Sequence, residues 1–103
     1  MGPIRSVYED DPDMFEIVRE FAVELPARIA KLEAHIAAGE MRELQTLAHQ
    51  LKGAGGGYGF PQITELAASL EQALKTGADA PLVKDRTSEL CATLRAIAIP
   101  EAR

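Results

Sequence analysis

Apolar side chains recur every three or four residues over residues 15–36, and this spacing constrains the fold more than any other feature of the chain. The series consists of Phe15, Val18, Ala22, Leu25, Ile29, Leu32 and Ile36. Because an α-helix makes one turn in about 3.6 residues, the series forms one apolar stripe on a single helix, predicted over residues 13–38. Pro26 lies inside the stripe. A proline there removes one backbone hydrogen bond, so we expect a kink.

Glycine and proline divide the rest of the chain into three further apolar stripes with helical spacing. These stripes predict helices over about residues 41–58, 61–76 and 80–98. The connections between the helices are short, and helices joined by short connections pack antiparallel. The sequence therefore predicts an all-α fold, an antiparallel up-down-up-down four-helix bundle with a kinked first helix. It would form a single domain over residues 1–103, with short polar tails.

The charge balance argues against a nucleic-acid-binding protein. Lysine and arginine total 11, aspartate and glutamate total 16, and the formal net charge is −5. No long basic run is present, whereas nucleic-acid binding needs clustered positive charge. No apolar run approaches the ~20 residues of a membrane span, and the N-terminus lacks the apolar stretch of a signal peptide. We expect a cytoplasmic protein without nucleic-acid or membrane partners. Since one bundle core is complete, we expect a monomer.

Four glycines fall inside the second predicted helix, at Gly53, Gly55, Gly56 and Gly57. Each glycine in a helix interior costs roughly 0.5–1 kcal/mol relative to alanine. A small domain gives up this stability only where bare backbone is needed. One alternative is that the helix ends near residue 52 and a glycine loop follows. Against it, Tyr58 continues the apolar stripe of the helix.

One face of this helix collects residues suited to phosphoryl transfer. His49 lies roughly 160° around the helix from the core residue Leu51, at 100° per residue. The residues that share its outer face are Gln45, His49, Lys52, Gly53 and Gly56. An exposed neutral imidazole is a nucleophile near pH 7. A lysine three residues later offers positive charge to phosphoryl oxygens.

The run from His49 to Gly53 (His-Gln-Leu-Lys-Gly), followed by small residues and then Tyr58-Gly59-Phe60, resembles the His-x-Leu-Lys-Gly signature of histidine phosphotransfer (HPt) domains. The resemblance extends over roughly residues 13–98. The chain departs from the family pattern in one respect, because Ala54-Gly55-Gly56-Gly57 is unusually rich in glycine. This composition is expected to loosen the helix locally.

The resemblance implies a phosphocarrier in a two-component phosphorelay. His49 would be the phosphoacceptor, modified on Nε2, and Lys52 would balance the phosphate charge. The phosphoryl group would come from a receiver-domain aspartate or a kinase and pass to another receiver aspartate. The expected partners are response-regulator receiver domains and a hybrid sensor histidine kinase. The expected partner-binding residues are Gln45, Ala48, Gly53 and Gly56, where the glycines give clearance to the receiver.

The chain would have no catalytic machinery and no cofactor of its own. Phosphoryl transfer needs a metal ion, and no Cys/His cluster is present. The resemblance implies that the receiver supplies the acidic pocket and Mg²⁺.

An antiparallel hairpin of the second and third helices would place Glu71 opposite His49. With the turn near Gly59-Phe60, facing residues have numbers that sum to about 120. A carboxylate on Nδ1 would fix the tautomer that leaves Nε2 free to attack. The family often has glutamine or glutamate at this position. The alternative is that Glu71 is a solvated helix charge that pairs with Lys75.

Two other functions fit the sequence. The first is a phosphorylation-inactive adaptor bundle that only docks receiver domains. Its apolar stripes would look the same, but an intact His49, Lys52 and Gly53 argue against it. The second is a hydrolase or metal enzyme, which needs a second ligand or base near His49, and only Glu71 qualifies. The sequence leaves open whether the chain is a free-standing relay or a domain of a larger kinase.

Overall fold

A computed structural model describes residues 2–101 of the protein. It contains four helices: α1 (Phe15–Ala38), α2 (Met41–Gly57), α3 (Pro61–Lys75) and α4 (Ala80–Arg95). Among the described residues the only extended pairing is an isolated bridge between Ile4 and Ile97. The fold is therefore all-α, as predicted. The outermost positions of the predicted domain, residue 1 and residues 102–103, lie outside the described residues.

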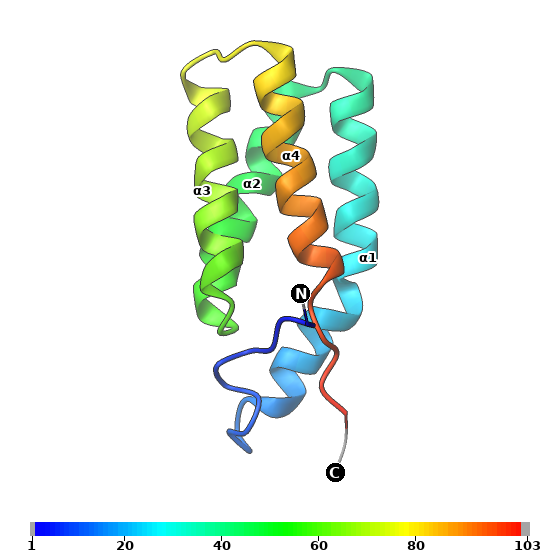
Figure 1. Cartoon of the computed structure of the whole chain (residues 1–103), viewed down its shortest axis with the longest axis vertical. Helices are drawn as coiled ribbons and strands as arrows, with labels where there is room; N and C mark the ends of the chain where they lie inside the picture. The colour runs from blue at the N-terminus through cyan, green and yellow to red at the C-terminus, as the bar shows by residue number, and fades with distance from the viewer. Residues whose placement is uncertain (1, 102–103) are drawn as a thin grey trace.

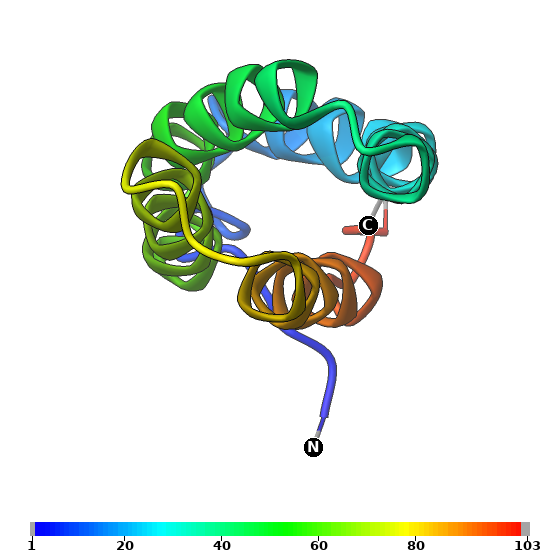
Figure 2. The same ribbon diagram turned by 90° about the horizontal axis from the view of Figure 1, so that it is seen from above.

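The four helices form a closed ring of neighbours around one core. Consecutive helices pack against each other, and α1 also packs against α4. In Figure 1 the chain runs up α1, down α2, up α3 and down α4, and the view from above shows the four helices in a ring (Figure 2). The helix α1 continues through Pro26 without interruption. The kink at this proline stays a prediction.

The core is built from the apolar stripes of all four helices. In α1 the middle of the stripe is buried, while its two ends, Phe15 and Ile36, are half-buried. The largest fully buried side chains are Phe60, Leu25, Leu32, Leu44, Leu51, Ile63, Leu70, Leu90 and Leu94. Burial of leucine and phenylalanine side chains contributes roughly 1.5–3 kcal/mol each, which makes this core the main source of stability.

Helix ends follow the glycines and one aspartate. Gly39 and Gly77 take the left-handed conformation directly after α1 and close after α3, each with φ of 70°. Before α4, the Asp79 carboxylate accepts a hydrogen bond from the backbone N–H of Leu82 at 3.1 Å. This N-cap satisfies a backbone donor that has no partner within the helix. These local signals explain why the helix boundaries are close to those predicted.

The prediction for the last helix is wrong at its end, because α4 stops at Arg95 and not at residue 98. The chain beyond it pairs with the N-terminal segment. The backbone N–H of Ile4 donates to the carbonyl of Ala96, and that of Ala98 donates to the carbonyl of Ile4, both at 2.8 Å. These two bonds occupy backbone groups in an extended pairing, so the helix does not continue.

The prediction of a polar N-terminal tail is also wrong, because residues 4–8 pack against the end of the bundle (Figure 1). Ser6 is buried, and its hydroxyl donates to the carbonyl of Tyr58 at 2.6 Å and accepts from the backbone N–H of Tyr8 at 3.0 Å. The backbone N–H of Val7 donates to the carbonyl of Gly59 at 3.0 Å. The segment therefore supports the connection between α2 and α3.

Candidate functional site

The glycine-rich stretch is the last part of a helix, since α2 continues to Gly57. The alternative of a glycine loop after residue 52 is therefore wrong. Gly55 faces α3, and a Cβ atom at this position would lie 2.7 Å from the backbone nitrogen of Thr64. The Thr64 hydroxyl donates to the carbonyl of Lys52 at 2.8 Å. Bare backbone at Gly55 thus lets α2 and α3 approach closely, six residues beyond His49.

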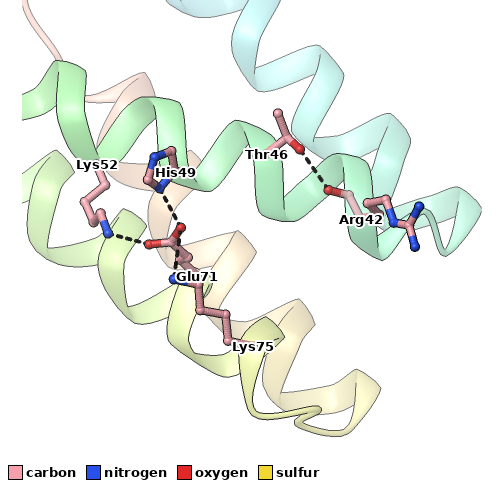
Figure 3. Close-up of polar contacts among 6 residues, drawn as sticks. All are labelled: Arg42, Thr46, His49, Lys52, Glu71 and Lys75. Atoms are coloured by element: carbon pink, nitrogen blue, oxygen red, sulfur yellow. Dashed lines mark hydrogen bonds and ion pairs between the residues drawn. The ribbon is translucent and has the colours of Figure 1, made fainter.

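His49 projects from α2 on the side opposite the core. Its side chain is 68% exposed, whereas Leu51, two residues later, is fully buried. The imidazole Nδ1 lies 2.7 Å from Oε2 of Glu71 on α3 (Figure 3). An ionised carboxylate can only accept hydrogen bonds, so Nδ1 carries a proton, and in the neutral ring Nε2 then has the free lone pair. The ring therefore presents a nucleophilic nitrogen directed away from Glu71.

Glu71 is a buried carboxylate with a cation or hydrogen-bond donor at each oxygen. Only 4% of the residue is exposed. Its Oε1 accepts from Lys52 Nζ at 2.5 Å, while Lys75 Nζ lies 3.7 Å from Oε2. The alternative that Glu71 is a solvated helix charge is wrong, because the carboxylate is buried. The ion pair with Lys75 that this alternative includes is present. Glu71 thus joins α3 to both His49 and Lys52 on α2.

The surroundings of Glu71 keep it ionised. The hydrogen bond from Lys52 has the largest influence and lowers the pKa of Glu71, while burial opposes this by raising it. The hydrogen bond with His49 and the charges of Lys52 and Lys75 lower it further, and the resulting pKa is about 2, compared with an ordinary 4.5. At neutral pH the carboxylate is therefore charged and holds the Nδ1 proton of His49.

This low pKa predicts a specific acid dependence of stability. Below about pH 4.5 the Glu71 carboxyl group is protonated in the unfolded state, whereas in the folded state it stays ionised down to about pH 2. The stability that Glu71 contributes is thus present above about pH 4.5 and lost as the pH falls from 4.5 towards 2. Glu71→Gln should reduce the slope of the unfolding free energy against pH in this window. Near pH 3 the reduction should correspond to nearly one proton taken up on unfolding. Urea unfolding at several pH values measures the slope. Glu65→Gln, on the exposed side of α3, is the control and should keep the wild-type slope; a wild-type slope in Glu71→Gln would contradict the assignment.

The structure places three of the four predicted partner-binding residues on the surface around His49. Gly53 and Gly56 are exposed, and Gln45 is half-buried. The prediction that Ala48 binds the partner is wrong, because Ala48 is completely buried. It lies on the core-facing stripe of α2 with Leu44, Leu51 and Gly55, at spacings of four, three and four. This spacing was a sequence signal that Ala48 packs inside the bundle.

An open depression of about 550 Å³ lies beside His49, between α2 and α3. It is lined by Arg42, Gln45, Thr46, His49, Gln50, Glu71 and Lys75. Arg42 and Lys75 are the two cations in this lining, and the sequence prediction did not place either of them at the functional site. A signal was available, since Arg42 precedes His49 by two helical turns and Lys75 follows Glu71 by one.

Within residues 2–101, no three His, Cys, Asp or Glu side chains gather in a way that could hold a metal ion. In the same part of the chain, no helix is long and apolar enough to cross a membrane. The site thus consists of an exposed imidazole, one buried carboxylate and nearby ammonium groups. An imidazole held at Nδ1 and open at Nε2 can accept an electrophilic group, and the cations suit one that carries negative charge.

Comparison with known families agrees with this chemistry. The family model described as Hpt domain matches residues 16–99. The matched range contains His49, Lys52 and Glu71. No curated protein and no solved structure matches the chain. Hpt domains transfer phosphoryl groups in two-component signalling and interact with receiver domains and kinases. Since the match extends over most of the sequence, the chain belongs to the Hpt domain family.

Proposed function

We propose that this protein accepts a phosphoryl group on Nε2 of His49 from the aspartyl phosphate of a receiver domain and passes it to the aspartate of another receiver. The observation that carries the proposal is the 2.7 Å contact between His49 Nδ1 and Glu71 on an imidazole that is 68% exposed. The contact fixes the tautomer, and the exposure admits a large donor. A nucleophile that is both oriented and accessible is what a phosphocarrier needs.

The transfer step conserves the Nδ1 proton. The lone pair of Nε2 attacks phosphorus, the nitrogen–phosphorus bond forms, and the bond between phosphorus and the aspartate oxygen breaks. The aspartate leaves as a carboxylate with the electron pair of that bond. The phosphorylated ring then has substituents on both nitrogens and carries a positive charge. Glu71 stabilises this charge through the hydrogen bond that it already makes. The reverse sequence returns the group to a second aspartate.

The remaining parts of the reaction come from two sources. Lys52 supplies positive charge that balances the phosphoryl oxygens, and its side chain is only 35% exposed, so it lies close to the surface of α2. The receiver supplies the acidic pocket and the Mg²⁺ that neutralises charge in the transition state. The protein itself contributes position and electrostatics, which makes it a carrier and not a catalyst in this proposal.

The receiver is proposed to dock on the surface formed by Gln45, Lys52, Gly53 and Gly56. Gly56 is exposed, and a Cβ atom there would meet only the Thr64 hydroxyl at an ordinary distance of 3.7 Å. Gly56→Arg should therefore preserve the fold but weaken receiver binding at least tenfold, because a bulky side chain would separate the two surfaces. Ala34→Arg adds the same side chain to the exposed face of α1 and should bind normally. Titration calorimetry against a receiver that phosphorylates the protein measures both; equal affinities would contradict this docking surface.

The proposal as a whole is tested with a panel of phosphorylated receiver domains. The expected result is transfer of label to this protein in a form that is labile in acid and stable in base, as a phosphohistidine is. Binding of receivers without any label would overturn the proposal in favour of the adaptor function.

A further inference from the structure

Glu71 has more hydrogen-bond and ion-pair partners than one carboxylate in a simple ion pair needs. His49 and Lys52 come from α2, and Lys75 comes from α3, one turn beyond Glu71 itself (Figure 3). Lys52 is within hydrogen-bond distance of Oε1, whereas the 3.7 Å between Lys75 Nζ and Oε2 exceeds that distance but remains within ion-pair range. The two lysines therefore hold the same carboxylate unequally.

The proposed function gives Lys52 two tasks that conflict. Before phosphorylation its ammonium group is hydrogen-bonded to Glu71. After phosphorylation the negative charge of the phosphoryl group bound to Nε2 of His49 attracts the same ammonium group towards the phosphoryl oxygens. If Lys52 turned to the phosphoryl group alone, Glu71 would lose its strongest partner while still buried. The charged ring of phosphorylated His49 would then be the one hydrogen-bonded partner left on Glu71, and the loss of a hydrogen-bonded cation from a buried carboxylate is unfavourable.

Lys75 is placed to prevent this loss. Its side chain is 52% exposed, so it can move without disturbing the core. It starts from the same helix as Glu71, at the i+4 position, where helical side chains meet. It approaches Oε2, the oxygen that also accepts from His49. A small movement of the ammonium group would convert the present ion pair into a hydrogen bond.

We propose that Lys75 is a positioning residue that takes over Glu71 when Lys52 turns to the phosphoryl group of His49. The inference rests on the proposed function and adds a second, alternating cation to it. Lys52 and Lys75 then exchange between two arrangements, in which Glu71 is never without an ammonium partner. The carboxylate stays charged and keeps its hydrogen bond to Nδ1 in both the free and the phosphorylated protein.

A receiver-independent donor isolates this step from docking. In the reaction with the zwitterion of phosphoramidate, whose nitrogen carries three protons, Nε2 of His49 attacks phosphorus, the phosphorus–nitrogen bond of the donor breaks, and ammonia leaves with the electron pair of that bond. Lys75→Met should lower the rate of labelling about tenfold, the effect of removing a partner from a buried charge, and Lys75→Arg should restore most of it. Lys84→Met is the matched control, because Lys84 lines a separate cleft between α1 and α4, and it should label at the wild-type rate.

A second measurement separates positioning from a merely structural role. In ¹⁵N NMR of the lysine side chains, the Lys52 ammonium should be hydrogen-bonded in the free protein, and the Lys75 ammonium should become protected from solvent exchange on phosphorylation. If the wild type takes label and Lys75→Met takes it equally fast, this inference alone is overturned. The same holds if the Lys75 signal does not change on phosphorylation. A wild-type protein that takes no label from phosphoramidate or from any receiver would overturn the proposed function and the inference with it.

Discussion

His49→Ala should abolish phosphoryl transfer and leave the fold intact. The variant lacks the only side chain at the site that combines a free nucleophilic lone pair with exposure, so transfer should fall by roughly 10³-fold or more, to the limit of detection. The imidazole is 68% exposed, and Glu71 keeps its hydrogen bond from Lys52 without it. The unfolding free energy should therefore change by about 1 kcal/mol or less, as for other exposed side chains.

The measurement is a single-turnover transfer from a phosphorylated receiver, run beside thermal unfolding of both proteins. The other histidine, His35, provides the control, since it lies at the end of α1 and contacts Glu40. His35→Ala should transfer at the wild-type rate. Transfer by His49→Ala at a comparable rate, with the fold retained, would show that the phosphoryl group is carried elsewhere.

Gly55→Ala should destabilise the protein although alanine is the better helix former. The added methyl group would lie 2.7 Å from the backbone nitrogen of Thr64 and 3.0 Å from Cβ of Ile63. These are parts of α3 that cannot rotate away, so the two helices must separate. Overpacking of this kind typically costs about 1–3 kcal/mol, which exceeds the gain of roughly 0.5–1 kcal/mol from removing a helical glycine.

Gly57→Ala is the matched comparison for this effect. It lies in the same helical turn, and an added Cβ atom would meet nothing within 4 Å. Its thermal midpoint should rise, whereas that of Gly55→Ala should fall by several degrees, since about 1 kcal/mol corresponds to roughly 4–8 °C in a domain of this size. Equal shifts in the two variants would show that α2 and α3 do not require bare backbone at Gly55.

The sequence predicted the helices and the central pair of the site because both depend on regular spacing. A stripe with a period near 3.6 residues fixes which side of each helix is buried. Short connections between helices then bring particular turns together. The facing of His49 and Glu71 follows from these two facts alone, and the structure places the two side chains 2.7 Å apart.

The sequence did not predict two kinds of feature. One depends on irregular backbone, and the other depends on how neighbouring side chains of a helix divide between core, surface and shared partners. Residues 4–8 have no helical period, so nothing indicated that Ser6 would bond to the carbonyl of Tyr58. Ala48 is adjacent to His49 in sequence, and a small residue fits a docking surface as well as a core. Because Ala48 lies 100° from His49 around the helix, it faces the core and not the exposed surface. Lys75 was predicted only as an alternative partner of Glu71. Helical spacing shows which two side chains can pair, but not how one carboxylate is shared among several partners.

The central claim is that His49 carries the phosphoryl group on Nε2 while Glu71 holds Nδ1. Phosphorus–proton correlation NMR of the phosphorylated protein tests it directly. Nε2 is bonded to two ring carbons that carry protons, and Nδ1 to only one. The account predicts that the phosphorus signal couples to both ring protons of His49. Coupling to a single ring proton, or a phosphorus signal that persists in His49→Ala, would contradict it.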